Sequence, residues 1–110
     1  MKQYVIDELR YQDYEKIKKY LDESLGELQL GGIYWFPIDD RLLNPVQAAH
    51  TACRPFFFAL DLVPERLCCE LLVRTKNRIR CACISYADEV QRNWMITTID
   101  AVLEKLEIIT

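Results

Sequence analysis

Four of the five cysteines fall within the 22 residues from Arg66 to Ala87, in the segment RLCCELLVRTKNRIRCACISYA. Thiolates are ligands for zinc and other soft metal ions, and two neighbouring thiols can form a disulfide. Cysteine also serves as a small apolar side chain inside a sheet. The three roles are distinguished by the faces on which the predicted strands place these cysteines.

Three strands are predicted around the cysteines, at residues 56–63, 67–74 and 79–86. A hairpin turn at Pro64-Glu65 joins the first two and predicts the pairs Val63–Arg66, Leu62–Leu67, Leu60–Cys69, Phe58–Leu71 and Phe56–Val73. Every position on the core face then meets an apolar partner, which is the condition that selects a register.

A loop of residues 75–77 is predicted to join the second and third strands and to pair Val73 with Ile79, Leu71 with Cys81 and Cys69 with Cys83. Cys69, Cys81 and Cys83 then share the core face, while Cys68 points to the other face. Structural zinc sites usually take cysteines two to four residues apart on turns. We therefore expect buried, apolar thiols and neither a metal nor another cofactor, with a disulfide between Cys69 and Cys83 as the redox alternative.

His50 is the only histidine, and Cys53 follows it by three residues in the segment QAAHTAC. On a helix both lie on one side, where the imidazole could activate the thiol. They are the candidate catalytic residues of an alternative function, an enzyme or small-molecule-binding protein whose pocket also includes Tyr34 and Trp35. The local context of a cysteine hydrolase is missing, so we expect no catalytic activity of the chain itself.

The outer face of the predicted sheet carries aromatic and apolar side chains, and we expect an interaction surface formed by Trp35, Phe57, Leu72 and Tyr86. Such a face is typical of a chain that pairs with itself or docks a protein partner. The alternative is that a short helix at 45–53 covers this face within the chain.

Basic residues crowd the tip of the second predicted hairpin, and Arg74, Arg78 and Arg80 are candidate anion-binding residues. The whole chain has a net charge of −3, which gives no general attraction to nucleic acid. A homo-oligomer or a protein partner is therefore expected rather than nucleic acid. The N-terminus lacks the apolar run of a secretory signal and no stretch reaches membrane-spanning length, so we expect a cytoplasmic protein without membrane contact.

Helix signals occur in three places. Apolar residues from Tyr14 to Leu25 recur at steps of three and four and stop at Gly26. Asn44 and Pro45 begin a short helix that ends by Arg54, and Ser85 or Asp88 caps a last helix with the apolar stripe Met95, Ile99, Val102 and Leu106. Between the first two helices, the segment LQLGGIYWFPID predicts a strand that is an edge strand or ends near Pro37.

These elements predict a single α+β domain over residues 1–110. An antiparallel sheet of four to five strands has helices packed mainly on one face, the face of Phe56, Leu71 and Cys81. The expected function is a small cytosolic, non-catalytic interaction or regulatory module that self-associates.

Overall fold

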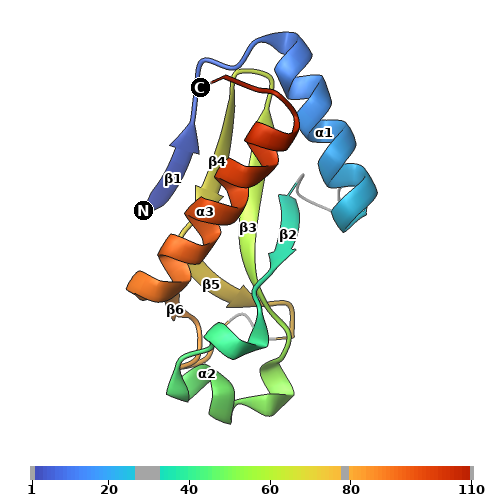
Figure 1. Cartoon of the computed structure of the whole chain (residues 1–110). Coiled ribbons are helices and arrows are strands. Elements are labelled where there is room, and N and C mark those ends of the chain that lie inside the picture. The colour runs from blue at the N-terminus through green and yellow to red at the C-terminus, as the bar shows by residue number, and fades with distance from the viewer. Residues whose placement is uncertain (1, 27–32, 78–79, 110) are drawn as a thin grey trace.

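The computed structural model describes residues 2–26, 33–77 and 80–109. Along the chain the elements are β1 (Gln3–Ile6), α1 (Tyr11–Leu25), β2 (Ile33–Pro37), the 3-10 helix η1 (Asp40–Leu42), α2 (Pro45–Ala49), the 3-10 helix η2 (Thr51–Cys53), β3 (Phe56–Val63), β4 (Arg66–Glu70), β5 (Leu72–Thr75), β6 (Ser85–Tyr86) and α3 (Glu89–Lys105). The predicted α+β class is confirmed: the helices pack on an antiparallel sheet (Figure 1).

The strands follow the order β1-β4-β3-β5-β6, and β2 pairs with the other edge of β3. The first hairpin has the predicted register, with Leu60 opposite Cys69 and Val63 opposite Arg66. The turn residues and the apolar face select the same pairing, because a slip by one residue would turn the apolar side chains outward.

The core lies between one face of the sheet and the helices α1 and α3. Phe56, Phe58 and Leu60 from β3 are completely buried. Side chains from both helices complete this core, namely Ile17, Leu21, Met95, Ile99 and Leu103. The ring of Trp94 on α3 stacks on Phe36 at 5.7 Å and on Phe58 at 6.4 Å between centroids. No helix in the described ranges is both long and apolar enough to cross a membrane.

The predicted helix boundaries at Gly26, Asn44 and Asp88 are confirmed, whereas the predicted helix at 45–53 is divided at His50 into α2 and η2. Gly26 ends α1 with φ of 85°, a backbone conformation that glycine adopts without steric cost. Asn44 caps α2 and Asp88 caps α3, each through a side-chain oxygen that accepts a hydrogen bond from the backbone N–H three residues later. On α3 the fully buried stripe ends at Leu103, whereas Val102 and Leu106 are half-buried.

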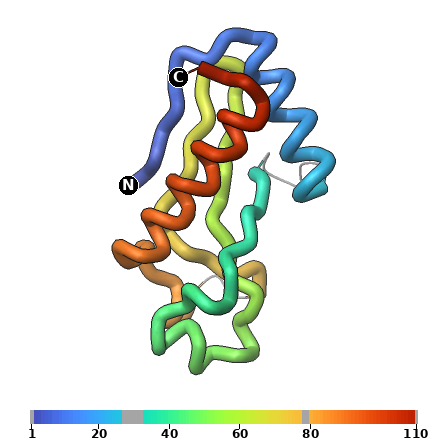
Figure 2. The backbone as a smooth tube through the Cα atoms, in the orientation of Figure 1, coloured from blue at the N-terminus to red at the C-terminus, as the bar shows by residue number. Residues whose placement is uncertain are grey.

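The C-terminal residues after α3 lie beside the connection between β1 and α1 (Figure 2). Ile109 and residues 4–9 line a pocket of about 320 Å³ there, together with Asp13. The Tyr4 hydroxyl on β1 donates a hydrogen bond to the Asp100 carboxylate on α3, and this contact connects the first strand to the last helix.

The second predicted hairpin is wrong. The predicted strand 67–74 is divided into β4 and β5 at Leu71, and of the third predicted strand only Ser85 and Tyr86 are extended in a ladder within the described residues. Val73 pairs with Ser85 rather than with Ile79, which lies outside the described residues. Cys81 and Cys83 therefore stand in a connecting turn and not on a strand.

The division at Leu71 explains this difference. Between the pairs Leu60–Cys69 and Phe57–Arg74, β3 holds two residues (58–59) and the facing segment holds four (70–73), so two extra residues are accommodated around Leu71. There the N–H of Leu71 donates to Lys2 O at 3.0 Å, and its carbonyl accepts from Ala87 N at 2.7 Å. As a result Phe56 pairs with Thr75, two residues beyond the predicted partner Val73. A shift by two keeps each side chain on its face, and Val73 remains completely buried.

Candidate functional site

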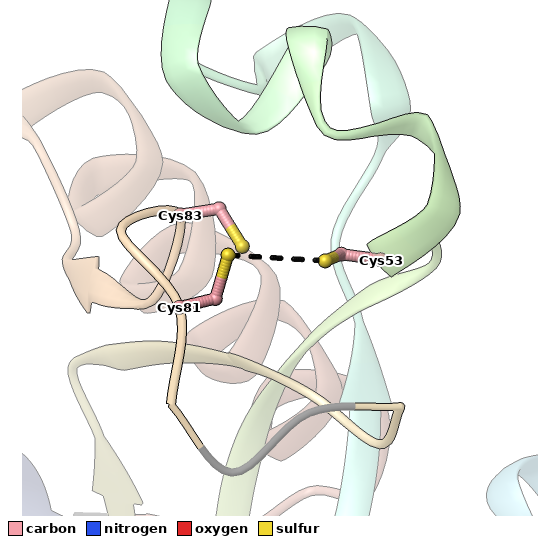
Figure 3. A group of neighbouring side chains, drawn as sticks. All are labelled: Cys53, Cys81 and Cys83. Atoms are coloured by element: carbon pink, nitrogen blue, oxygen red, sulfur yellow. Dashed lines mark hydrogen bonds between the residues drawn. The ribbon is translucent and has the colours of Figure 1, made fainter.

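Three thiols converge at one end of the sheet (Figure 3). The sulfur atoms of Cys53, Cys81 and Cys83 all lie within 4.8 Å of one another. The Sγ of Cys53 is 4.0 Å from the Sγ of Cys81, and the structure records the three cysteines as free thiols. Two segments that are distant in sequence supply the group.

The local backbone explains how each segment presents its sulfur. Cys53 is the last residue of η2, where its N–H donates to His50 O at 3.0 Å. Cys81 and Cys83 flank one residue in a turn that is closed by the Ile84 N–H donating to Cys81 O at 3.0 Å. In an extended strand the 81 and 83 side chains would point the same way about 7 Å apart, whereas a turn lets their sulfurs meet.

Two buried glutamines support the turn. Gln47 on α2 donates from Nε2 to Cys83 O at 3.3 Å, and its Oε1 accepts a hydrogen bond of 2.8 Å from Gln91 Nε2 on α3. Gln91 also donates to Leu42 O at 2.9 Å. Both side chains are completely buried and belong to capping boxes, so α2, α3 and the cysteine turn hold a fixed relative position.

Further hydrogen bonds join the segment after β5 to the segment of Cys53. The Thr75 hydroxyl donates to Cys53 O. Asn77 Nδ2 donates to Ala52 O at 3.3 Å and to Arg54 O at 3.2 Å. The start of the loop that carries Cys81 and Cys83 is thus anchored to the backbone around Cys53, and Gln47 holds the loop at Cys83.

The three thiols differ in their electrostatic surroundings. The backbone N–H of Cys83, the thiols of Cys83 and Cys53, and the nearby His50 together lower the pKa of Cys81 from 9.0 to about 7. Burial and the neighbouring thiols raise the pKa of Cys83 to about 12. Cys81 is half-buried, whereas Cys53 and Cys83 are buried. Cys81 is therefore the reactive member of the group.

His50 lies at the end of α2, beside this group. Its Nδ1 is 2.6 Å from Val46 O, and a carbonyl can only accept, so Nδ1 carries a proton. The neutral ring then has its lone pair on Nε2, the form in which imidazole binds a metal or accepts a proton.

Cys69 lies apart from the three thiols, contrary to the sequence prediction. It pairs with Leu60 on one side and with Tyr4 on the other, and it is completely buried. Burial raises its pKa to about 12. The predicted opposition of Cys69 and Cys83 is absent from the register of the described strands, so the structure gives no basis for a disulfide between them. Cys68 points to the opposite face, as expected.

The four residues of the expected interaction surface share the outer face of the sheet. Trp35 pairs with Ala59, and Phe57 pairs with Arg74. Leu72 stands two residues before Arg74 on β5, and therefore on the same face, and it pairs with Tyr86. Trp35 and Phe57 contact each other edge to face at 5.7 Å, and the Lys76 ammonium lies over both rings. The helices α1 and α3 pack on the other face, and α2 lies past the end of the sheet (Figure 1).

The residues of the alternative pocket do not all point to one place. Tyr34 is buried and donates a hydrogen bond to Asp22 on α1, whereas its neighbour Trp35 points to the outer face. The two side chains therefore do not line a common pocket. Cys53 belongs to the thiol group, and His50 stands three residues before it at the end of α2.

The three candidate anion-binding residues do not form one described patch. Arg74 makes an ion pair of 3.0 Å with Glu70, which offsets its charge. Arg80 is exposed, and Arg78 lies outside the described residues.

The sequence analysis missed the roles of Gln47 and Gln91 and the grouping of Cys53 with Cys81 and Cys83. A signal existed for the glutamines, because each stands three residues after a cap, as in a capping box. The motifs H-x-x-C at 50–53 and C-x-C at 81–83 were the corresponding signal for the thiols. Comparison with protein-family models, curated proteins and solved structures finds no match, so function is inferred from the residues themselves.

Proposed function

We propose that this chain is a non-catalytic interaction module of the cytoplasm that self-associates through the outer face of its sheet. The observation that carries the proposal is an apolar side-chain layer on the face opposite α1 and α3. Phe57 and Ala59 are buried there, at 9% and 3% exposure, yet neither belongs to the core cluster under the helices.

Partly exposed apolar residues surround this layer. Val5 is 41% exposed and Tyr86 is 42% exposed, while Trp35, Leu72 and Cys68 are half-buried. Apolar area that remains in contact with water favours association, at about 25 cal/mol for each Å² removed from water. A contiguous patch of such residues is typical of an interface rather than of a solvated sheet face.

The charges on this face favour a second copy of the chain as the partner. Asp61 and Arg66 are both exposed, and each stands on the outer side of the first hairpin, with Asp61 paired to Cys68 and Arg66 paired to Val63. A two-fold interface brings the same patch of both copies together, so a face with both signs of charge can complement itself.

Sedimentation equilibrium over a range of concentrations tests the proposal. The wild type is expected to form a dimer, and Tyr86→Glu to weaken dimerisation by at least about 10-fold, because it places a charge in the apolar patch. Val90→Glu is the matched control, since Val90 is 62% exposed on α3 and outside this face. Circular dichroism checks that each variant is folded. A wild type that stays monomeric at all concentrations, or an equal loss in Val90→Glu, would refute self-association through this face.

A further inference from the structure

Packing alone does not account for the three converging thiols. Cys69 shows the apolar role of cysteine, because it is completely buried within the sheet. Cys81, by contrast, is half-buried in a turn and points at two other sulfurs (Figure 3). The sequence argument against a metal required the cysteines to lie within strands, and this does not hold for Cys81 and Cys83.

The distances fit a metal centre. A tetrahedral zinc ion with Zn–S bonds of about 2.3 Å sets its sulfurs about 3.8 Å apart. The Sγ atoms of Cys53 and Cys81 are 4.0 Å apart, and all three sulfurs lie within 4.8 Å. Shifts of well under 1 Å would therefore bring the three sulfurs onto three corners of a zinc tetrahedron.

We propose that Cys53, Cys81 and Cys83 bind one zinc ion through their thiolates. Each thiol gives up its proton on binding, and the soft sulfur set selects zinc over hard cations such as magnesium. The hydrogen bond from Gln47 to the Cys83 carbonyl, 3.3 Å long, holds the turn in place before the metal arrives. This inference is independent of the self-association proposed above.

The fourth ligand is the imidazole of His50. It is the only histidine of the chain and stands three residues before Cys53. In the observed conformation its Nδ1 donates to Val46 O at 2.6 Å, and the ligand atoms within 4.8 Å of one another are those of the three cysteines alone. A rotation of this half-buried side chain, with loss of the Val46 contact, completes a Cys3His set, one of the usual structural zinc sets.

The test uses the full chain, reduced and stripped of metal by a chelator, with Zn²⁺ and the spectroscopic probe Co²⁺. Native mass spectrometry is expected to show one zinc ion per chain. The Co²⁺ complex is expected to show sulfur-to-metal charge transfer and the intense visible bands of tetrahedral coordination. Mg²⁺ is expected not to compete, because it prefers oxygen ligands.

Cys81→Ser is the informative variant, since Cys81 is half-buried and its replacement spares the core. Its zinc affinity, measured against a competing chelator, is expected to fall more than about 100-fold. A loss of this size exceeds the one expected when a residue that only hydrogen-bonds to a metal ligand is replaced. Cys68→Ser is the matched control, because Cys68 is also half-buried but lies on the outer face of β4, and it is expected to bind like the wild type. Zinc should also raise the melting temperature of the wild type and of Cys68→Ser, but not of Cys81→Ser.

Two results would overturn the three-thiolate site: a wild type that binds no zinc, or Cys81→Ser and Cys68→Ser with equal affinities. His50→Ala tests the fourth ligand separately. A change in the visible Co²⁺ bands with intact charge transfer supports His50 as a ligand, and an unchanged spectrum removes it from the set.

Discussion

Gln91 Nε2 on α3 donates a hydrogen bond of 2.8 Å to Gln47 Oε1 on α2, and both side chains are completely buried. Each glutamine also accepts a hydrogen bond of 3.1 Å from the N–H of the residue that caps its own helix. Two capping boxes are therefore joined at their N3 positions, and through Gln47 the pair reaches the turn of Cys83. This contact connects the helix starts to the candidate metal centre.

Gln91→Leu is expected to lower the free energy of unfolding by about 2 to 3 kcal/mol, because it keeps the size but leaves buried partners unsatisfied. The carbonyl of Leu42 and the N–H of Asp88 lose their hydrogen bonds to this side chain. Urea denaturation measures the effect. Thr97→Ala, at an exposed position of the same helix, serves as the control and should change stability by less than about 0.5 kcal/mol. Equal stabilities of Gln91→Leu and the wild type would show that the network contributes nothing.

Gly26→Ala is expected to destabilise the protein by about 1 to 3 kcal/mol through the backbone alone. Gly26 has φ of 85° and ψ of 166°, a region open essentially only to glycine, and an added Cβ would meet nothing within 4 Å. The cost is therefore conformational and not steric crowding by neighbours. Thermal and urea unfolding measure it, with the exposed Ser24→Ala in α1 as control. A melting temperature of Gly26→Ala equal to that of Ser24→Ala would contradict the strained conformation.

Alkaline pH is expected to destabilise the protein through Cys69. Burial raises the pKa of this thiol from 9.0 to about 12, so the unfolded chain loses the proton at lower pH than the folded chain. The stabilisation is complete below about pH 9 and is lost as pH rises towards 12, with a slope of at most about 1.4 kcal/mol per pH unit.

Urea denaturation between pH 8 and pH 11 should therefore show a shallower decline for Cys69→Ala and Cys69→Val than for the wild type. The two variants differ in side-chain volume and so in absolute stability, but neither has a thiol to ionise. Curves that run parallel to that of the wild type would show that Cys69 does not titrate differently in the folded and unfolded states.

The sequence by itself determined the parts of the fold that depend on neighbours along the chain. The cap residues Asn44 and Asp88 and the stop at Gly26 act within one helix turn. The pairing of Leu60 with Cys69 follows from a two-residue turn and an alternating apolar face. These signals are local, so the helix boundaries and the register of the first hairpin could be predicted without the rest of the structure.

Only the tertiary structure decided the thiol centre. The ladder with β3 is interrupted by two extra residues around Leu71, whose backbone pairs there with Lys2 and Ala87 from other segments of the chain. That break shifts the register after it and turns the expected third strand into the loop of Cys81 and Cys83. Cys53 then joins them across 28 residues, because the anchors at Gln47 and Thr75 connect the two segments. Hydrogen bonds between distant segments leave no periodic pattern in a sequence, and for that reason the cysteines that meet could not be read from their spacing.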